Sequence, residues 1–223
     1  MNRILKTNGL ILVLFFCTSF QNLSAQTIKD VFTSSGTSIL YLGIDFTQTR
    51  LIGEATVKGI DMRDKYFPGI NDLVINEPKK FDLQKAFNKT KINNDLGIVA
   101  KRNKNVNAED IMSANSSDYS RLKEEDINKL VREIDFEQKK GIGLLFIVEG
   151  MIKGAKKGDD SYSSVWVTIV DMGANKVLMT ERMEGNTSGG ISFRNYWANT
   201  IYDVIEHIDK KKYKKWKKKY GAA

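Results

Sequence analysis

The sequence has few of the residues on which most enzymes and metal sites depend. It contains one cysteine and one histidine among 223 residues. Cys17 lies in the apolar segment near the start, so the chain after residue 25 has no thiol for a disulfide, a zinc–thiolate site or a nucleophile. His207 stands alone, and neither an HExxH metal motif nor a GxSxG elbow occurs. We therefore predict no catalytic residues, no metal site and no cofactor.

Long apolar runs are also scarce. The longest, Leu10–Phe20, has eleven residues, whereas a membrane-spanning helix needs about 20. Arg3 and Lys6 precede this run, and the small pair Ser24-Ala25 follows it, which is the three-part pattern of a signal peptide. We predict that residues 1–25 are a signal peptide and that the protein is exported, to the periplasm or cell envelope or as a secreted protein. A retained N-terminal anchor is the alternative.

The net charge of +8 is unevenly placed. Two of the 35 basic residues lie in the leader and eight lie between Lys210 and Lys219, which leaves 25 basic against 27 acidic residues in residues 26–209. A nucleic-acid-binding fold is expected to carry a basic patch on its body. The nearly neutral body therefore predicts no specific nucleic-acid partner. We divide the chain into a signal peptide (1–25), a single mixed α/β domain (26–209) and a basic, aromatic tail (210–223).

Hydrophobic patterning predicts the order β-α-β-β-α-β-β-β-α. Residues 101–119 are polar and predict a surface loop. Such an order is typical of an α+β (α/β-like) fold, with a single mixed sheet, a C-terminal three-stranded antiparallel meander and helices packed on the sheet. In chain order, the predicted elements are strand 37–46, helix 61–77, strands 81–87 and 95–100, helix 120–140, strands 143–153, 162–172 and 176–184, and a last helix that Ser192 caps.

A glycine pair precedes the last helix. Unpaired N–H groups at a helix start bind anions, and Arg194 in the first turn adds a positive charge. The segment therefore predicts a ligand or anion site formed by Gly189, Gly190, Arg194, Asn195 and Trp197. In the alternative interpretation the segment is a plain strand-to-helix connection whose aromatic residues fill the core.

The tail interleaves aromatic residues with eight lysines. If the last helix continues, the aromatic residues recur every three or four positions on one face. A helix with aromatic and lysine faces suits an anionic membrane interface. The same composition also suits nucleic acid or an anionic polysaccharide, and a solvated tail is the plainest alternative. The predicted membrane-surface residues are Lys210, Lys211, Lys212, Tyr213, Lys214, Lys215, Trp216, Lys217, Lys218, Lys219 and Tyr220.

Carboxylates in otherwise apolar surroundings suggest one enzymatic alternative. A pair that meets in a cleft is able to hydrolyse a polymer of the envelope. Solvent-facing or turn-capping positions are the more ordinary interpretation. The candidates are Asp45, Asp61, Glu77, Glu149 and Asp171.

Three segments carry a resemblance. The strand GIGLLFIVEGMIKG, the hairpin VWVTIVDMGANKVLMTERM and the RNYW that follows the glycine pair resemble a family of uncharacterised exported proteins of Bacteroidetes-type bacteria. More loosely, they are similar to periplasmic α/β domains of the curli-secretion lipoprotein and of the N-terminal domain of the Tol-system propeller protein. The resemblance implies an envelope location and assembly or binding in place of catalysis.

These observations predict a non-enzymatic module of the cell envelope that binds or assembles and is held near a membrane by its tail. The predicted partner is an envelope protein, an anionic membrane or an anionic polymer. The alternatives are the carboxylate hydrolase and a small carrier of an anion or other ligand. The oligomeric state stays open.

Overall fold

The computed structural model describes residues 27–156, 158–187 and 189–222, so the predicted signal peptide lies outside the described residues. Seven strands form one sheet: β1 (Ile39–Asp45), β2 (Arg50–Ile52), β3 (Ile92–Asn94), β4 (Met112–Ser113), β5 (Ile142–Ile152), β6 (Ser161–Asp171) and β7 (Lys176–Thr187). The α-helices are α1 (Ile28–Thr33), α2 (Gly59–Asp61), α3 (Phe67–Asn76), α4 (Leu83–Ala86), α5 (Gly97–Lys104), α6 (Glu124–Arg132), α7 (Phe193–His207) and α8 (Tyr213–Tyr220). Two π-helical turns, η1 (Met62–Tyr66) and η4 (Ile208–Lys212), and two 3₁₀ turns, η2 (Ala108–Asp110) and η3 (Ser116–Ser120), complete the elements.

The seven strands occupy five positions in the sheet. β1 and β2 both pair in parallel with β5, β1 along its first half and β2 along its last three residues. β3 and β4 extend the same edge by pairing in parallel with β1 and β2, respectively. On the other side, β5, β6 and β7 form the antiparallel meander. The sheet is therefore mixed, as predicted, with its long strands in the C-terminal half.

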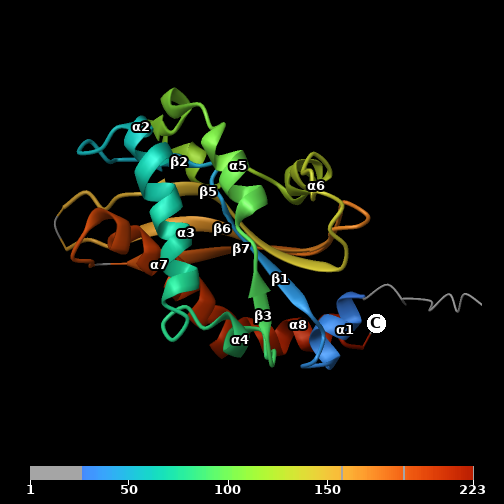
Figure 1. Ribbon diagram of the computed structural model, residues 1–223. Helices are drawn as coiled ribbons and strands as arrows, with labels where there is room; N and C mark the ends of the chain where they lie inside the picture. The colour runs from blue at the N-terminus through green and yellow to red at the C-terminus, as the bar shows by residue number, and fades with distance from the viewer. Residues whose placement is uncertain (1–26, 157, 188, 223) are drawn as a thin grey trace, which may run out of the picture.

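Helices cover both faces of the sheet (Figure 1). The strand β5 alternates between the two cores: Leu144 and Phe146 face one, and Leu145 and Ile147 face the other. The larger core lies under α1, α3, α4, α7 and α8, and the smaller one lies under α5 and α6. Among the described residues, none of the helices combines the length and the apolar composition that crossing a membrane requires.

Two buried asparagines hold the break between β1 and β2. Gly43 has a φ of +103°, and its pairing with β5 shifts register there. A Cβ on this glycine would lie 2.8 Å from Oδ1 of Asn71. That oxygen accepts the Ile44 N–H at 2.7 Å, and Oδ1 of Asn103 accepts the Phe46 N–H at 2.8 Å. These amides replace ladder partners, so the edge is interrupted with its backbone groups satisfied.

The predicted fold class, meander and last helix are confirmed, but two short strands are wrong. Residues 81–87 form the turn that contains α4, because Asp82 caps the helix by accepting the Lys85 N–H at 2.9 Å. Residues 95–100 open α5 instead of a strand, and Asp95 accepts the Gly97 N–H at 3.0 Å. Short apolar runs fit either structure, and the cap at Asp82 and the turn at Asp95 favour the helix.

Two further boundaries differ from the prediction. The helix expected over residues 120–140 is shorter, because α6 ends at Arg132. Glu137 and Gln138 have φ of 52° and 61°, which no helix that reached residue 140 would allow. The predicted loop over residues 101–119 contains the end of α5, two 3₁₀ turns and the short strand β4. Ile134 and Phe136 still fill the smaller core, although they lie beyond the helix.

Candidate functional site

The residues predicted around the glycine pair lie in different environments. Trp197 is buried in the larger core, whereas Arg194 is exposed, and the stem of its side chain lies over Gly69 of α3. Nε of Arg194 donates to Oδ1 of the neighbouring Asn195 at 3.2 Å. The Asn195 N–H at the helix start is already capped by Ser192 Oγ at 3.3 Å. These side chains therefore do not converge on one site, and the Asn195 N–H at the helix start already has a partner within the protein.

Gly190 lines a shallow depression on the surface. It packs against the backbone of Tyr196, and Nζ of Lys153 lies 3.7 Å from the centroid of the Tyr196 ring. The carbonyl of Gly189 accepts a hydrogen bond from Asn199 at 2.8 Å. The depression therefore carries a cation that an aromatic ring already engages.

Glu149 is fully buried and fully engaged. Its carboxylate accepts Arg182 Nε at 2.7 Å, Ser164 Oγ at 2.6 Å and the Leu122 N–H at 2.8 Å. These donors occupy the oxygens that a catalytic carboxylate would present to a substrate. The group joins β5 to β6, β7 and the segment before α6, and its role in the structure is to hold these elements together.

Of the other candidate carboxylates, Asp45 lies nearest to Glu149 in the sheet, since it pairs with Ile147 of β5. Asp171 caps the β6–β7 turn, seven residues from Glu149 along the β5–β6 pair, which corresponds to about 23 Å. Asp45 is buried and paired with Arg102 at 2.8 Å. Asp61 and Glu77 are exposed on helical segments. The two buried carboxylates, Asp45 and Glu149, are each held by an arginine. Among the described residues no group of three or more acidic, histidine or cysteine side chains is placed to hold a metal ion.

The C-terminal tail is a docked helix. The path from α7 through η4 to α8 is continuous across residue 210, and Trp216 is only 2% exposed. The Trp216 ring lies 6.2 Å from both Phe32 of α1 and Phe87, measured between centroids. Tyr213 and Tyr220 pack around Phe32 at 5.8 and 5.7 Å. The predicted aromatic stripe therefore forms, but it faces the domain core and not the outside.

Glu181 of β7 holds the same helix through two hydrogen bonds. It accepts Nε1 of Trp216 at 2.5 Å and also accepts Nζ of Lys212. Burial alone would raise the pKa of Glu181, but the hydrogen bonds from Lys212 and Trp216 outweigh it and hold this pKa below its ordinary value. The carboxylate therefore stays ionised and keeps both donors in place at neutral pH.

Seven of the eight tail lysines are exposed, and Lys212 is the one that takes part in this contact. Lys210 pairs with Glu206 at 2.5 Å and Lys212 pairs with Glu181. The other six are exposed and have no ion-pair partner among the described residues, and four of these six recur at three- and four-residue spacings on the side opposite Trp216. We call these four the lysine face: Lys211, Lys214, Lys215 and Lys218.

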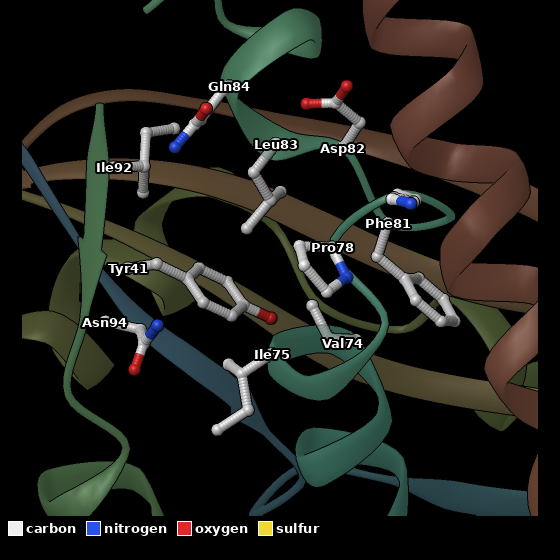
Figure 2. Close-up of a pocket in the computed structure, with 11 residues that line it drawn as sticks. Tyr41, Val74, Ile75, Pro78, Phe81, Asp82, Leu83, Gln84, Ile92 and Asn94 are labelled. Carbon is white, nitrogen blue, oxygen red and sulfur yellow. The ribbon is translucent and has the colours of Figure 1, made fainter. Parts of the chain in front are cut away.

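A pocket of about 360 Å³ opens beside the edge of the sheet, and the sequence did not predict it (Figure 2). Its floor is the β1–β3 pair, where Tyr41 lies opposite Asn94. Val74 and Ile75 of α3 form one wall, and the turn and helix that follow form the other. The lining residues are Tyr41, Val74, Ile75, Pro78, Lys79, Phe81, Asp82, Leu83, Gln84, Ile92 and Asn94.

The comparisons with known proteins do not identify a family. No family model and no curated protein matches the sequence. Among solved structures, the chain is similar to the 1.65 Å structure of the hypothetical protein CT253 from Chlamydia trachomatis, with 9% identity and a TM-score of 0.35. That similarity covers 84% of this chain and 99% of the other. At this TM-score it supports no inference about fold or function.

Proposed function

We propose that this protein is an exported, non-enzymatic binding module of the cell envelope that adsorbs to an anionic membrane through the lysine face of α8. The observation that carries the proposal is a helix whose aromatic residues pack against the core and whose unpaired lysines are all exposed. Export is part of the proposal because the sequence predicts a signal peptide over residues 1–25.

The docking contacts make the lysine face a rigid surface. Eight like charges oppose helix formation in water, because neighbouring lysines repel one another. Burial of Trp216 against Phe32 and Phe87 offsets that repulsion and holds α8 in place. The lysines therefore keep a fixed arrangement before a partner arrives, which lowers the entropy cost of binding.

The energy available from this face is enough for reversible adsorption. A basic residue close to an anionic bilayer contributes roughly 1 kcal/mol. Four residues then give about 4 kcal/mol at low salt, and the attraction falls off over a Debye length of about 10 Å in 0.1 M salt. Binding of this kind is peripheral, because the aromatic side chains that would insert into lipid are committed to the core.

Vesicle flotation with charge variants tests the proposal. Residues 26–223 are mixed with phosphatidylcholine vesicles that contain or lack phosphatidylglycerol. The wild type is expected to float only with the anionic vesicles. Replacement of the whole lysine face by glutamine is expected to weaken binding at least tenfold, since roughly 1 kcal/mol is lost at each position. Deletion of residues 210–223 is a poorer test, because it removes Trp216 from the core.

A matched control separates the lysine face from net charge. Four exposed lysines on the opposite side of the sheet are changed to glutamine, which alters the net charge by the same amount; they are Lys101, Lys104, Lys129 and Lys140. This variant is expected to bind like the wild type. Equal loss in both variants would reduce the effect to net charge and contradict the proposal. Binding of dextran sulfate without binding of vesicles would contradict the membrane as the partner and indicate an anionic polymer instead.

A further inference from the structure

We infer that the pocket beside β1 and β3 is a binding site for a small, mainly apolar organic molecule that presents a hydrogen-bond acceptor to the Tyr41 hydroxyl. This site is separate from the lysine face, and its ligand is different from the membrane partner proposed above. The inference rests on the state of Tyr41, on the shape of the pocket and on the charges at its mouth.

Tyr41 is buried without a partner for its polar atom. The side chain is 0% exposed, and its hydroxyl makes no hydrogen bond to any described residue. Figure 2 shows the ring entering the pocket with the hydroxyl directed toward Val74 and Pro78. A buried hydroxyl that lacks a partner costs free energy, whereas a phenylalanine would keep the ring contact with Phe146 without that cost. A ligand oxygen would supply the missing partner.

The hydroxyl acts as a donor in this interaction. Burial raises the pKa of Tyr41 above its ordinary value, so the group keeps its proton at any physiological pH. A carbonyl, ether or hydroxyl oxygen of the ligand fits this donor. An isolated hydrocarbon fills the same volume but leaves the hydroxyl unsatisfied.

The volume and lining indicate the size and character of the ligand. An engineered apolar cavity of about 150 Å³ binds benzene, so 360 Å³ accommodates a substituted ring or a short acyl chain. Six apolar side chains line the pocket together with Tyr41, which is the pattern of a small-molecule site with few orienting polar groups. These six are Val74, Ile75, Pro78, Phe81, Leu83 and Ile92.

The mouth of the pocket favours a neutral ligand. Lys79 and Asp82 contribute opposite charges there, and Gln84 and Asn94 contribute neutral amides. One oxygen of Asp82 is already used by the Lys85 N–H. A ligand with a strong net charge of either sign would meet a like charge as well as an opposite one. The polar end of an uncharged molecule can instead reach the two amides.

A pair of probes that differ in one oxygen tests the site. Binding of 4-fluoroacetophenone and of 4-fluoroethylbenzene is measured by fluorine NMR on the wild type, and amide shifts of the labelled protein locate the probe. The acetophenone is expected to bind about tenfold more tightly, since only it accepts a hydrogen bond from Tyr41. The shifts are expected in residues 74–84 and 92–94, which line the pocket.

Substitution of the tyrosine gives the decisive comparison. Tyr41→Phe keeps the ring and is expected to abolish the preference between the probes while the protein stays folded, because no internal hydrogen bond is lost. Tyr162→Phe, a tyrosine outside the pocket, is expected to keep the preference. Equal binding of the two probes by the wild type, a preference that survives Tyr41→Phe, or no binding of either probe would overturn the inference. The lysine-face variant is expected to bind both probes normally, so failure here is distinct from failure at the membrane.

Discussion

Trp216→Ala is expected to release the C-terminal helix from the domain. The ring is buried between Phe32 and Phe87, and its N–H is bonded to Glu181. Alanine removes the ring from all three contacts and leaves Glu181 with Lys212 as its remaining donor. The rest of α8 is rich in lysine, and its like charges repel one another, so few contacts would hold the helix on the core without the ring.

The magnitude follows from the size of the side chain. A buried tryptophan covers about 150–250 Å² of surface, which at about 25 cal/mol per Å² corresponds to about 4–6 kcal/mol as an upper value. Measured costs of replacing a buried aromatic residue by alanine run from about 3 to 5 kcal/mol. The free energy of undocking α8 should fall by about this amount. At 3 kcal/mol the undocked population rises by roughly a hundredfold.

Limited trypsin digestion measures this population directly. Trypsin cleaves after lysine, and the tail holds eight lysines that a docked helix protects. The Trp216→Ala variant is expected to lose its tail at least a hundredfold faster than the wild type, as followed by mass spectrometry of the shortened protein. Lys176 and Arg182, the tryptic positions of β7, should stay uncut over the same time.

A second variant separates local release from general loss of stability. Ile127→Ala creates a cavity in the smaller core, on the other side of the sheet. It is expected to lower the midpoint of urea unfolding without selective cleavage of the tail. Equal rates of tail cleavage in the wild type and in Trp216→Ala would show that the helix is already open, and would refute the docking that the lysine face depends on.

Three further substitutions test other contacts. Burial lowers the pKa of Lys89 to about 8, so above that pH the folded state holds fewer protons than the unfolded state. The free energy of unfolding of the wild type, measured in urea, should therefore rise by about 2–3 kcal/mol relative to that of Lys89→Met between pH 7 and pH 10. A Cβ at Gly185 would lie 1.9 Å from the Thr200 carbonyl oxygen, so Gly185→Ala should push α7 away from β7 and cost about 1–3 kcal/mol of stability. An unchanged midpoint of urea unfolding would contradict this close packing of α7 on β7. Glu149→Ala leaves Arg182 without its buried partner and should cost about 3–5 kcal/mol in the same assay, whereas a stable variant would show the pair to be dispensable.

The sequence predicts the long elements well because their signals are local. The meander strands have eleven or twelve residues each, and Gly173 and Asn175 mark the turn between the last two. Ser192 caps the last helix as expected, by accepting the Asn195 N–H. The short elements near residues 81–100 depend on the helix cap at Asp82 and the turn at Asp95, and their apolar residues alone did not distinguish helix from strand.

The site depends on contacts that no local pattern contains. The three- and four-residue spacing of the tail aromatic residues predicts a stripe, but their partners Phe32 and Phe87 come from distant segments. Burial by the domain and insertion into lipid therefore look alike in the sequence. The Tyr41 hydroxyl is a similar case, since a tyrosine within an apolar strand gives no sign of whether its oxygen will find a partner.

The central claim is that exposed lysines on a docked helix hold the protein at an anionic surface. The salt dependence of vesicle binding by unaltered residues 26–223 tests it most directly. If the lysine face is responsible, the partition coefficient on phosphatidylglycerol vesicles should fall steeply between about 0.05 and 0.5 M salt, because the Debye length shortens across this range. Binding that stays constant over the same range, or that is equal on neutral vesicles, would contradict the account.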